Sequence, residues 1–410
     1  MMNQKLEKYA KLAVNVGANV QKNQYVIIRT TTEAKELTRL IAKEAYIKGA
    51  KKVYTLWADD YVAHDTFKYA SNETLGEFDD WVVSQYEHFV NHDSCFISVI
   101  SPIPGLNADI DPTKMQISAK ASQQKLGFFQ SHTMGNKSQW TIVANPNPVW
   151  AKQVFPNLEE TQAVDALWEA IFSACRITND NDPIMEWEKH NQALAKRNQK
   201  LNELNFKTLH FKNSLGTDLV VGLVKNHLWA GGGEKSTQGV YFNPNIPTEE
   251  NFTMPDKLVT TGKVVATKPL NYQGKLIDEF WLEFKDGKVV NYDAKKEKEA
   301  LTGLLNTDEG SKYIGEIALI SHDSPISNTN ILFLTTLFDE NASCHMALGR
   351  AYPMNIKNGL LASRKELEKQ GCNFSMIHVD FMFGSSDMEI TGTQYDGTLV
   401  TVFKNGNFVI

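Results

Sequence analysis

The stretch QYVIIRTTTEAKELTRLIAKEAYIKGAKKVYTLW, which runs from Gln24 to Trp57, decides the fold of the first part of the chain. It begins with a short β-branched run that ends at Arg29, and it closes with a second such run, Lys52–Trp57. Between them, apolar residues recur at helical spacing up to Gly49, which predicts a helix. A strand, a helix and a strand with short connections form a right-handed βαβ unit, and this unit implies a parallel sheet.

The same alternation continues on both sides of this unit. A helix is expected over residues 3–18, and further helices and strands are expected in turn at Trp81–Val90, Cys95–Ile100, Pro112–Lys125, Trp140–Ala144 and Gln162–Cys175. We therefore predict that residues 1–180 form an α/β domain with a mainly parallel, doubly wound sheet. A dinucleotide or nucleoside triphosphate ligand is not indicated, because no GxGxxG follows the first strand and no GxxxxGKS/T motif occurs.

The second part of the chain has a different pattern. The turn-rich break Asn179–Pro183 precedes a polar helix over residues 184–204, which we expect to connect two domains. Strands dominate from Phe206 onward, and Asp286-Gly287 between two alternating runs predicts a hairpin. A helix is expected at Lys295–Leu305, and later strands at Ile331–Leu334, Met376–Phe383 and Leu399–Phe403. Residues 181–410 are thus predicted to form a strand-rich α+β domain that carries the catalytic residues.

Composition narrows the class of protein. The 410 residues carry a formal net charge of −6 with both signs interspersed, which argues against a nucleic-acid partner. No apolar run approaches the ~18 residues that a membrane-spanning helix needs, and the N-terminus lacks a secretory signal pattern. The four cysteines are far apart without a CxxC pair, which disfavours a disulfide framework and a cysteine-based zinc site. We expect a cytoplasmic protein that binds neither nucleic acid nor membrane.

Two neighbouring stretches of the second part concentrate side chains that can ligate metals or move protons. FDENASCHMALGRAY (Phe338–Tyr352) and MIHVDFM (Met376–Met382) together contain Glu340, His345, Tyr352, His378 and Asp380. The first stretch is interpreted as a cluster at a loop edge, since a glycine follows its apolar residues, and functional residues gather in such places. Carboxylates and imidazoles at this density favour a divalent-metal site.

The order His-Val-Asp at residues 378–380 adds a geometric argument. Residues i and i+2 of a strand share a face, so His378 and Asp380 project together while Val379 and Phe381 pack into the core. For this pair alone, a structural His–Asp hydrogen bond is the alternative interpretation, because buried polar groups normally find partners.

Two acidic positions lie further upstream. Glu249 and Glu250 follow a proline turn, and Glu316 begins an apolar strand, where a solvated strand end is the simpler explanation for either site alone. Adjacent divalent ions need several carboxylates, because acid oxygens bridge the ions and cancel their charge. Such ions activate a water molecule and polarise a carbonyl, a carboxylate can act as general base, and a tyrosine hydroxyl can stabilise an oxyanion. The chain has no HExxH motif of single-zinc proteases.

These residues leave three classes of function open. A dinuclear hydrolase of peptides is one, and a phosphoesterase with the same ligands is another. Phosphate sites usually recruit arginine, lysine or helix N-termini, and only Arg350 lies within the cluster. A non-enzymatic α/β binding protein is the third.

Four segments carry a resemblance to a known family. They are NIPTEENFT (Asn245–Thr253), the strand entry at Gly315-Glu316, NASCHMALGRAYP (Asn341–Pro353) and MIHVDFMFG (Met376–Gly384). With these segments the sequence resembles the metallo-aminopeptidases of the aminopeptidase T, AmpS and PepS type over essentially all 410 residues. The resemblance implies an α/β N-terminal domain, a C-terminal catalytic domain and a homodimer. It implies removal of N-terminal amino acids from peptides, with two divalent ions per subunit, such as Zn²⁺, Co²⁺ or Mg²⁺.

The resemblance also implies roles for individual residues. By position, the metal ligands would be Glu250, Glu316, Glu340, His345, His378 and Asp380. Tyr352 would be a catalytic hydroxyl, and Glu316 is also expected to act in catalysis. The choice of Glu250 over Glu249 rests on the family pattern. Glu316 and Glu340 are both candidates for a bridging ligand or a base, and the sequence leaves these two roles unassigned.

Overall fold

The computed structural model describes residues 2–410. Contacts divide the chain into two compact units, Met1–Lys189 with Gly233–Pro247, and His190–Gly232 with Thr248–Ile410. The chain therefore passes between the units three times. That residues 1–180 and 181–410 are separate domains stays a prediction.

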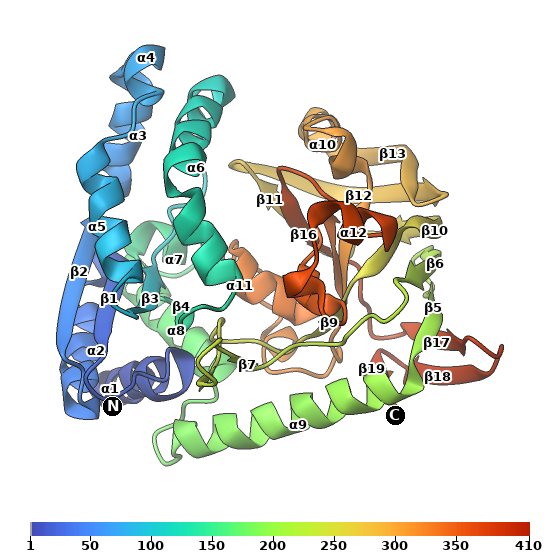
Figure 1. Cartoon of the computed structure of the whole chain (residues 1–410), viewed down its shortest axis with the longest axis horizontal. Helices are drawn as coiled ribbons and strands as arrows, with labels where there is room; N and C mark the ends of the chain where they lie inside the picture. Colours follow the sequence, from blue (N-terminus) through green and yellow to red (C-terminus); the bar gives the residue numbers. More distant parts are fainter. Residues whose placement is uncertain (1) are drawn as a thin grey trace. The chain divides into compact units, whose positions relative to one another are not determined.

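The first unit is built on a four-stranded parallel sheet in the order β2-β1-β3-β4. Its strands are β1 (Tyr25–Thr31), β2 (Lys52–Ala58), β3 (Cys95–Ile100) and β4 (Trp140–Ala144). Figure 1 shows them among the helices of the blue-to-green part of the chain. Val26, Ile27 and Ile28 are fully buried, as expected for a parallel strand that helices cover. The predicted α/β construction of this part is confirmed.

The helices of this unit alternate with its strands. They are α1 (Met2–Leu12), α2 (Lys35–Lys48), α3 (Asp60–Tyr69), α4 (Asn72–Leu75), α5 (Asp80–Val90), α6 (Pro112–Met134), α7 (Pro148–Val154) and α8 (Glu160–Ala174). Helix α6 runs past its predicted end at Lys125, because no residue before Gly135 terminates it. The short strands β7 (Glu234–Lys235) and β8 (Tyr241–Phe242) pair in the same unit. Across residues 2–410, no helix combines the length and the apolarity that crossing a membrane would require.

The second unit contains a large, mainly antiparallel sheet. Helix α9 (Pro183–Leu204) leads into it from the first unit. The strands follow the order β11-β12-β10-β6-β5-β17-β18-β19, and β13 pairs with β12. Their bounds are β5 (Phe206–Lys212), β6 (Asp218–Leu223), β10 (Pro255–Val265), β11 (Leu270–Tyr272), β12 (Lys275–Lys285), β13 (Lys288–Lys296), β17 (Glu389–Gln394), β18 (Leu399–Lys404) and β19 (Asn407–Phe408).

A smaller antiparallel sheet in the same unit has the order β16-β15-β14-β9. Its strands are β9 (Asn251–Thr253), β14 (Ile314–Leu319), β15 (His345–Gly349) and β16 (His378–Met382). One apolar cluster joins the two sheets: Phe211, Val221 and Phe280 come from the large sheet, and Ile317, Met346 and Phe381 from the small one. Helix α10 (Lys298–Leu305) packs Leu301 and Leu304 into the same cluster. The small sheet therefore has one face committed to the core.

One local prediction for this unit was wrong, and one predicted helix begins three residues later than expected. The apolar run Ile331–Leu334 was expected to be a strand, but it is an irregular loop. The carboxylate of Asp339, in α11 (Thr336–Asp339), accepts hydrogen bonds from the backbone N–H groups of Phe333 and Thr335, which fixes the loop without a strand partner. Helix α10 begins at Lys298, because β13 continues through Lys296.

The hairpin predicted at Asp286-Gly287 is present between β12 and β13. Gly287 has φ +80°, and a Cβ there would lie 1.7 Å from the carbonyl oxygen of Lys257. Gly397 has a similar φ of +89° but open space around it. A substitution at Gly397 would therefore cause backbone strain alone, whereas one at Gly287 would cause the same strain and a steric clash.

We expect Gly397→Ala to lower the free energy of unfolding by about 1 kcal/mol, because only the left-handed backbone is strained. Gly287→Ala is expected to cost about 3 kcal/mol or more, because the added methyl group also overlaps the backbone. Urea unfolding of both variants measures the difference, and equal costs would contradict this account of the turn.

Candidate metal centre

The small sheet has two chemically different faces. Ile317, Met346, Leu348 and Phe381 point into the core. The intervening residues project from the opposite face, because side chains alternate along a strand. Strand pairing places Glu316 opposite Ala347, and Ala347 opposite Asp380. The two acids therefore stand in one row across three strands, with a methyl group between them.

Neighbouring rows extend this polar face. His378 on β16 is paired with Gly349, and His345 on β15 is paired with Ala318, which in turn pairs with Phe252 on β9. Glu250 lies two residues before Phe252 and so falls on the same face if the chain stays extended. Each large polar residue thus has a small residue, Ala318, Ala347 or Gly349, as its neighbour on β14 or β15. This pattern leaves room between the polar side chains.

A β-bulge sets the orientation of Glu316. The register between β14 and β15 shifts between Ile314 and Glu316. Ile314 is in the core, and without the shift Glu316 would point there too, since residues i and i+2 share a face. Gly315 occupies the shift, and a Cβ at this glycine would lie 2.3 Å from the carbonyl oxygen of Arg350. The glycine is therefore required for the acid to reach the polar face.

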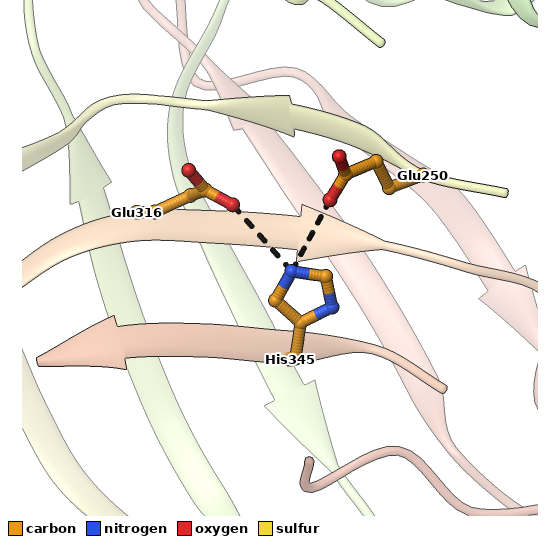
Figure 2. A group of neighbouring side chains, drawn as sticks. All are labelled: Glu250, Glu316 and His345. Carbon is orange, nitrogen blue, oxygen red and sulfur yellow. Dashed lines mark ion pairs between the residues drawn. The ribbon is translucent and has the colours of Figure 1, made fainter. Parts of the chain in front are cut away.

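Glu250, which directly precedes β9, and Glu316 of β14 converge on His345, as Figure 2 shows. Its Nε2 lies 3.2 Å from Oε2 of Glu250 and 3.5 Å from Oε1 of Glu316. All three residues are buried. One ligand atom from each lies within 4.8 Å of the others, a spacing that could hold a metal ion. His345 was expected at a loop edge, but it begins strand β15.

A second group of the same kind adjoins the first. It consists of Glu316, His378 and Asp380. His378 Nε2 lies 3.5 Å from Oδ2 of Asp380 and 3.8 Å from Oε2 of Glu316. The predicted common face of His378 and Asp380 is present, with Phe381 buried on the other side. Glu316 belongs to both groups and so links them.

Two further predicted residues surround these groups. Glu340 lies in the short 3₁₀ turn Glu340–Ala342 and belongs to neither group found among residues 2–410. Its negative charge nevertheless lies close enough to couple to Asp380 and Glu250. The ring of Tyr352 lies 4.7 Å from the ring of His378 and 6.4 Å from that of Phe252, measured between centroids. The structure thus brings all seven predicted residues into one region.

The structure also distinguishes the adjacent acids Glu249 and Glu250. Glu250 faces His345, whereas Oε2 of Glu249 lies 3.8 Å from Nε2 of His190 on α9. The backbone N–H of Glu249 donates to Asn341 Oδ1 over 2.8 Å, and the amide of Asn341 also contacts Glu340. Asn341 therefore ties the segment that carries Glu250 to the turn that carries Glu340. Sequence reasoning missed this link because Glu249 and Asn341 lie 92 residues apart in the chain.

The electrostatics of the centre show an excess of buried acid. Burial raises the pKa of Glu316 to about 7, although His345 and His378 oppose the change. Burial also raises the pKa of Glu340 well above its usual value, and the charges of Asp380 and Glu250 add to the effect. These carboxylates hold protons more tightly than they would in water, because like charges are confined away from solvent.

The imidazoles respond in the opposite sense. Burial alone would lower the pKa of His378, but the charge of Asp380 raises it to about 10. Burial would likewise lower the pKa of His345, and contacts with Glu250 and Glu316 raise it well above its ordinary value. The carboxylates around the two rings therefore favour a positive charge there, either a proton on the imidazole or another cation beside it.

A backbone contact orients one of these rings. Nδ1 of His378 lies 2.7 Å from the carbonyl oxygen of Arg350, which can only accept a hydrogen bond. Nδ1 therefore carries the proton, and Nε2 is left to face the acids. Metal-binding histidines are commonly oriented in this way. The Nε of Arg350 donates to the carbonyl oxygen of Ser375.

The donor set suits divalent cations. Oδ1 of Asp380 is buried and has no hydrogen-bond partner among residues 2–410. An acceptor atom in that state is destabilising unless a cation or proton meets it. Mixed carboxylate and imidazole ligands are typical of zinc and related divalent ions. The residues therefore fit a metal centre.

Comparison with known proteins gives a consistent result. The family described as thermophilic metalloprotease (M29) matches residues 2–408. Aminopeptidase 2 of Geobacillus stearothermophilus is 44% identical over 403 residues, which are 98% of this chain and 97% of that protein. Aminopeptidase AmpS of Bacillus subtilis (strain 168) is 44% identical over 405 residues, 99% of this chain and 98% of its own. Wild-type AmpT from Thermus thermophilus has a similar solved structure, with a TM-score of 0.93, 38% identity and 100% coverage of both chains.

These matches confirm the family resemblance and the fold class inferred from the sequence.

The row Glu316–Ala347–Asp380 predicts where a larger side chain would block the centre. We expect Ala347→Leu to reduce the affinity for Zn²⁺ at least tenfold, because the added carbons occupy the space between the two acids. Ala347→Gly, which adds nothing to that space, should keep the affinity. Calorimetric titration of the folded, metal-free variants measures both, and wild-type affinity in Ala347→Leu would show that the ions lie elsewhere.

Proposed function

This chain belongs to the thermophilic metalloprotease family M29, and we propose that it hydrolyses the first peptide bond of substrates with a free N-terminus at two divalent ions. Its similarity to aminopeptidases over nearly the whole chain makes it a metal-dependent aminopeptidase. The number of ions and the roles of single residues are the proposal. A homodimer in the cytoplasm is part of the same proposal.

One observation carries the two-ion proposal. Four buried or nearly buried acids and two imidazoles share one region, and their metal-spaced groups have Glu316 in common. The first ion would be held by Glu250, Glu316 and His345, and the second by Glu316, His378 and Asp380. Two divalent cations would carry four positive charges, which balance the charges of Glu250, Glu316, Glu340 and Asp380. Zn²⁺, Co²⁺ and Mg²⁺ are the candidate ions.

Bound divalent ions would supply an acidified water molecule and polarise the scissile carbonyl. The protein's own residues would complete the chemistry. Glu316 is shared by both groups, which favours a bridging role for it. Glu340 lies outside both groups and is therefore the better candidate to accept a proton. Both acids stay in the proposed catalytic and metal-binding set.

Tyr352 would act as a neutral hydrogen-bond donor. Burial raises the pKa of its hydroxyl well above the ordinary value, and the charges of Glu316 and Asp380 add to this. The phenol therefore keeps its proton and can donate it in a hydrogen bond to the oxygen of the attacked carbonyl as negative charge develops there. The substrate's free α-amine would bind to one of the ions or to a nearby acid, which would set cleavage at the first peptide bond.

A phosphoesterase is less well supported by the same geometry. Phosphate recognition relies on free cationic side chains or helix N-termini. Arg350 is the cationic residue predicted to lie nearest, and its Nε is bonded to the backbone at Ser375. A non-enzymatic binding protein does not agree with membership of a metalloprotease family.

The role of Glu316 can be tested with a nearly isosteric change. We expect Glu316→Gln to lower turnover of a leucine aminoacyl reporter about 100-fold or more, because the amide cannot bridge cations or accept a proton. Glu309→Gln is the control, since Glu309 is exposed and pairs with Lys288. A phosphoryl reporter measured in parallel should show no turnover with any variant. Unchanged aminopeptidase turnover in Glu316→Gln would exclude the proposed role.

Metal content gives an independent test. Elemental analysis is expected to find two divalent ions per chain, and a chelator should remove both activity and part of the thermal stability. Ligand bound only to the folded state stabilises it, by about 2.7 kcal/mol at 100 times the dissociation constant. Re-addition of Zn²⁺ or Co²⁺ should restore both properties. Less than one tightly bound ion per chain, without activation by added metal, would argue against a metal centre.

A further inference from the structure

The segment from Thr248 to Phe252 presents two faces to two different surroundings. Glu250 and Phe252 face the metal centre, where they approach His345 and Tyr352. Glu249 and Asn251 face α9, where their neighbours are His190 and Arg197. All of these residues lie in the second unit. The position of the Glu250 carboxylate therefore depends on how firmly α9 holds the opposite face.

Asn251 forms the centre of the contact with α9. Its Oδ1 accepts a hydrogen bond from Nη1 of Arg197 over 3.0 Å. Its Nδ2 donates to Oδ1 of Asn198 over 2.6 Å and to the carbonyl oxygen of Leu194 over 3.2 Å. Asn251 is fully buried, whereas Arg197 and Asn198 are half-buried, so the bond to Leu194 is shielded from water and the other two are partly shielded. The residue that follows Glu250 is thus held by three hydrogen bonds.

Further contacts fix the chain on both sides of Asn251. Nε2 of His190 lies 2.7 Å from the carbonyl oxygen of Thr248, to which it can donate. Asn198 also donates to the carbonyl oxygen of Gly231 over 3.1 Å. Gly231 has φ +132°, and a Cβ on it would lie 2.0 Å from the carbonyl oxygen of Glu250. The backbone of Glu250 is therefore enclosed between this glycine and the helix.

The α9 residues that make these contacts share one face of the helix. Positions 190, 194, 197 and 198 are spaced i, i+4, i+7 and i+8, which is the repeat of a single helical stripe. Arg197 is the only guanidinium in it. Burial lowers the pKa of Arg197, the negative charge of Glu249 acts in the opposite direction, and its guanidinium also lies 4.2 Å from the ring centre of Phe408. The stripe thus combines the buried Leu194 with three polar residues, His190, Arg197 and Asn198, which are half-buried.

We propose that Arg197, Asn198 and Asn251 are positioning residues for Glu250, which hold its carboxylate in place to receive one of the two metal ions. The inference rests on the proposed two-ion function. It follows from the geometry that the effect is asymmetric. Glu250 belongs to the group with His345 and Glu316, and not to the group with His378 and Asp380. Removing the hydrogen bonds of Arg197 or Asn198 to Asn251 should therefore weaken the ion site that contains Glu250 and leave the other ion site unchanged.

The experiment titrates metal-free protein with Zn²⁺ alone and follows both binding steps by calorimetry. Arg197→Met removes the donor to Asn251 while keeping an apolar stem of similar length. Residues that orient metal ligands typically contribute about 10–100-fold in affinity, so one dissociation constant should rise by that factor and the other should stay unchanged. Arg197→Lys, which keeps the charge and one donor, should recover part of the loss.

Two further variants make the result decisive. Lys196→Met removes a cation from the neighbouring, exposed position of α9 and should leave both dissociation constants unchanged. Asn198→Ala removes the bonds to Asn251 and Gly231, and it tests the same idea at a second half-buried position if Arg197→Met fails to fold. It should also weaken one site only, and by a smaller factor.

Each outcome separates the two proposals. If the wild type binds two Zn²⁺ ions and the folded variants keep both affinities, the positioning role is wrong and the two-ion function stands. If both sites weaken equally and in step with a lower unfolding temperature, the stripe is merely structural, which also overturns the positioning role. A wild type that binds no Zn²⁺ would overturn the proposed function, and the positioning role with it.

Discussion

The confinement of like charges on one face of the small sheet is the constraint on which the centre depends. Glu316 and Asp380 stand in the same row, and Glu250 and Glu340 are close enough to affect their protonation. Such a group of buried acids is unfavourable unless protons or cations neutralise it. The sheet tolerates the group because its opposite face is bound into a large apolar core. One face of the sheet stabilises the fold through apolar packing, and the other face carries the acids that can bind cations.

The bulge at Gly315 shows how local backbone structure serves this division. Ile314 and Glu316 are two residues apart, yet one packs in the core and the other reaches the acids. The register shift makes this possible, and only glycine fits so close to the carbonyl of Arg350. The same carbonyl oxygen accepts the Nδ1 proton of the opposite histidine, His378. The bulge at Gly315 thus orients Glu316, and it lies beside the Arg350 carbonyl that orients the ring of His378.

Patterns that act over a few residues were predictable, and those that depend on tertiary contacts were not. The common face of His378 and Asp380 follows from alternation along one strand, and the βαβ unit follows from period and length. The run Ile331–Leu334 looked like a strand, but the side chain of Asp339 satisfies its backbone. His345 looked like a loop residue, because the pairing that makes β15 a strand comes from β14 and β16. Five of the seven candidate residues stood out because acids and imidazoles are dense in two neighbouring stretches, whereas Glu250 and Glu316 joined the set through the family resemblance. That these two upstream acids meet the other five in space could not be derived from periodicity.

Helix α9 shows most clearly why polar residues are hard to interpret from sequence. Its composition predicted only a polar helix that connects two domains. Burial changes the meaning of its polar residues, because a polar group away from water must be matched by a partner. Arg197 and Asn198 find that partner in Asn251, beside Glu250. Hydrogen bonds have a preferred direction, so they fix one position of the segment around Asn251. Apolar contacts of the same shape would allow that segment to shift along the helix. Directional hydrogen bonds therefore suit the positioning role that we propose for α9, because the Glu250 carboxylate would have to be placed accurately to receive an ion. This gives a physical reason why the helix holds the segment beside Glu250 with an amide and a guanidinium.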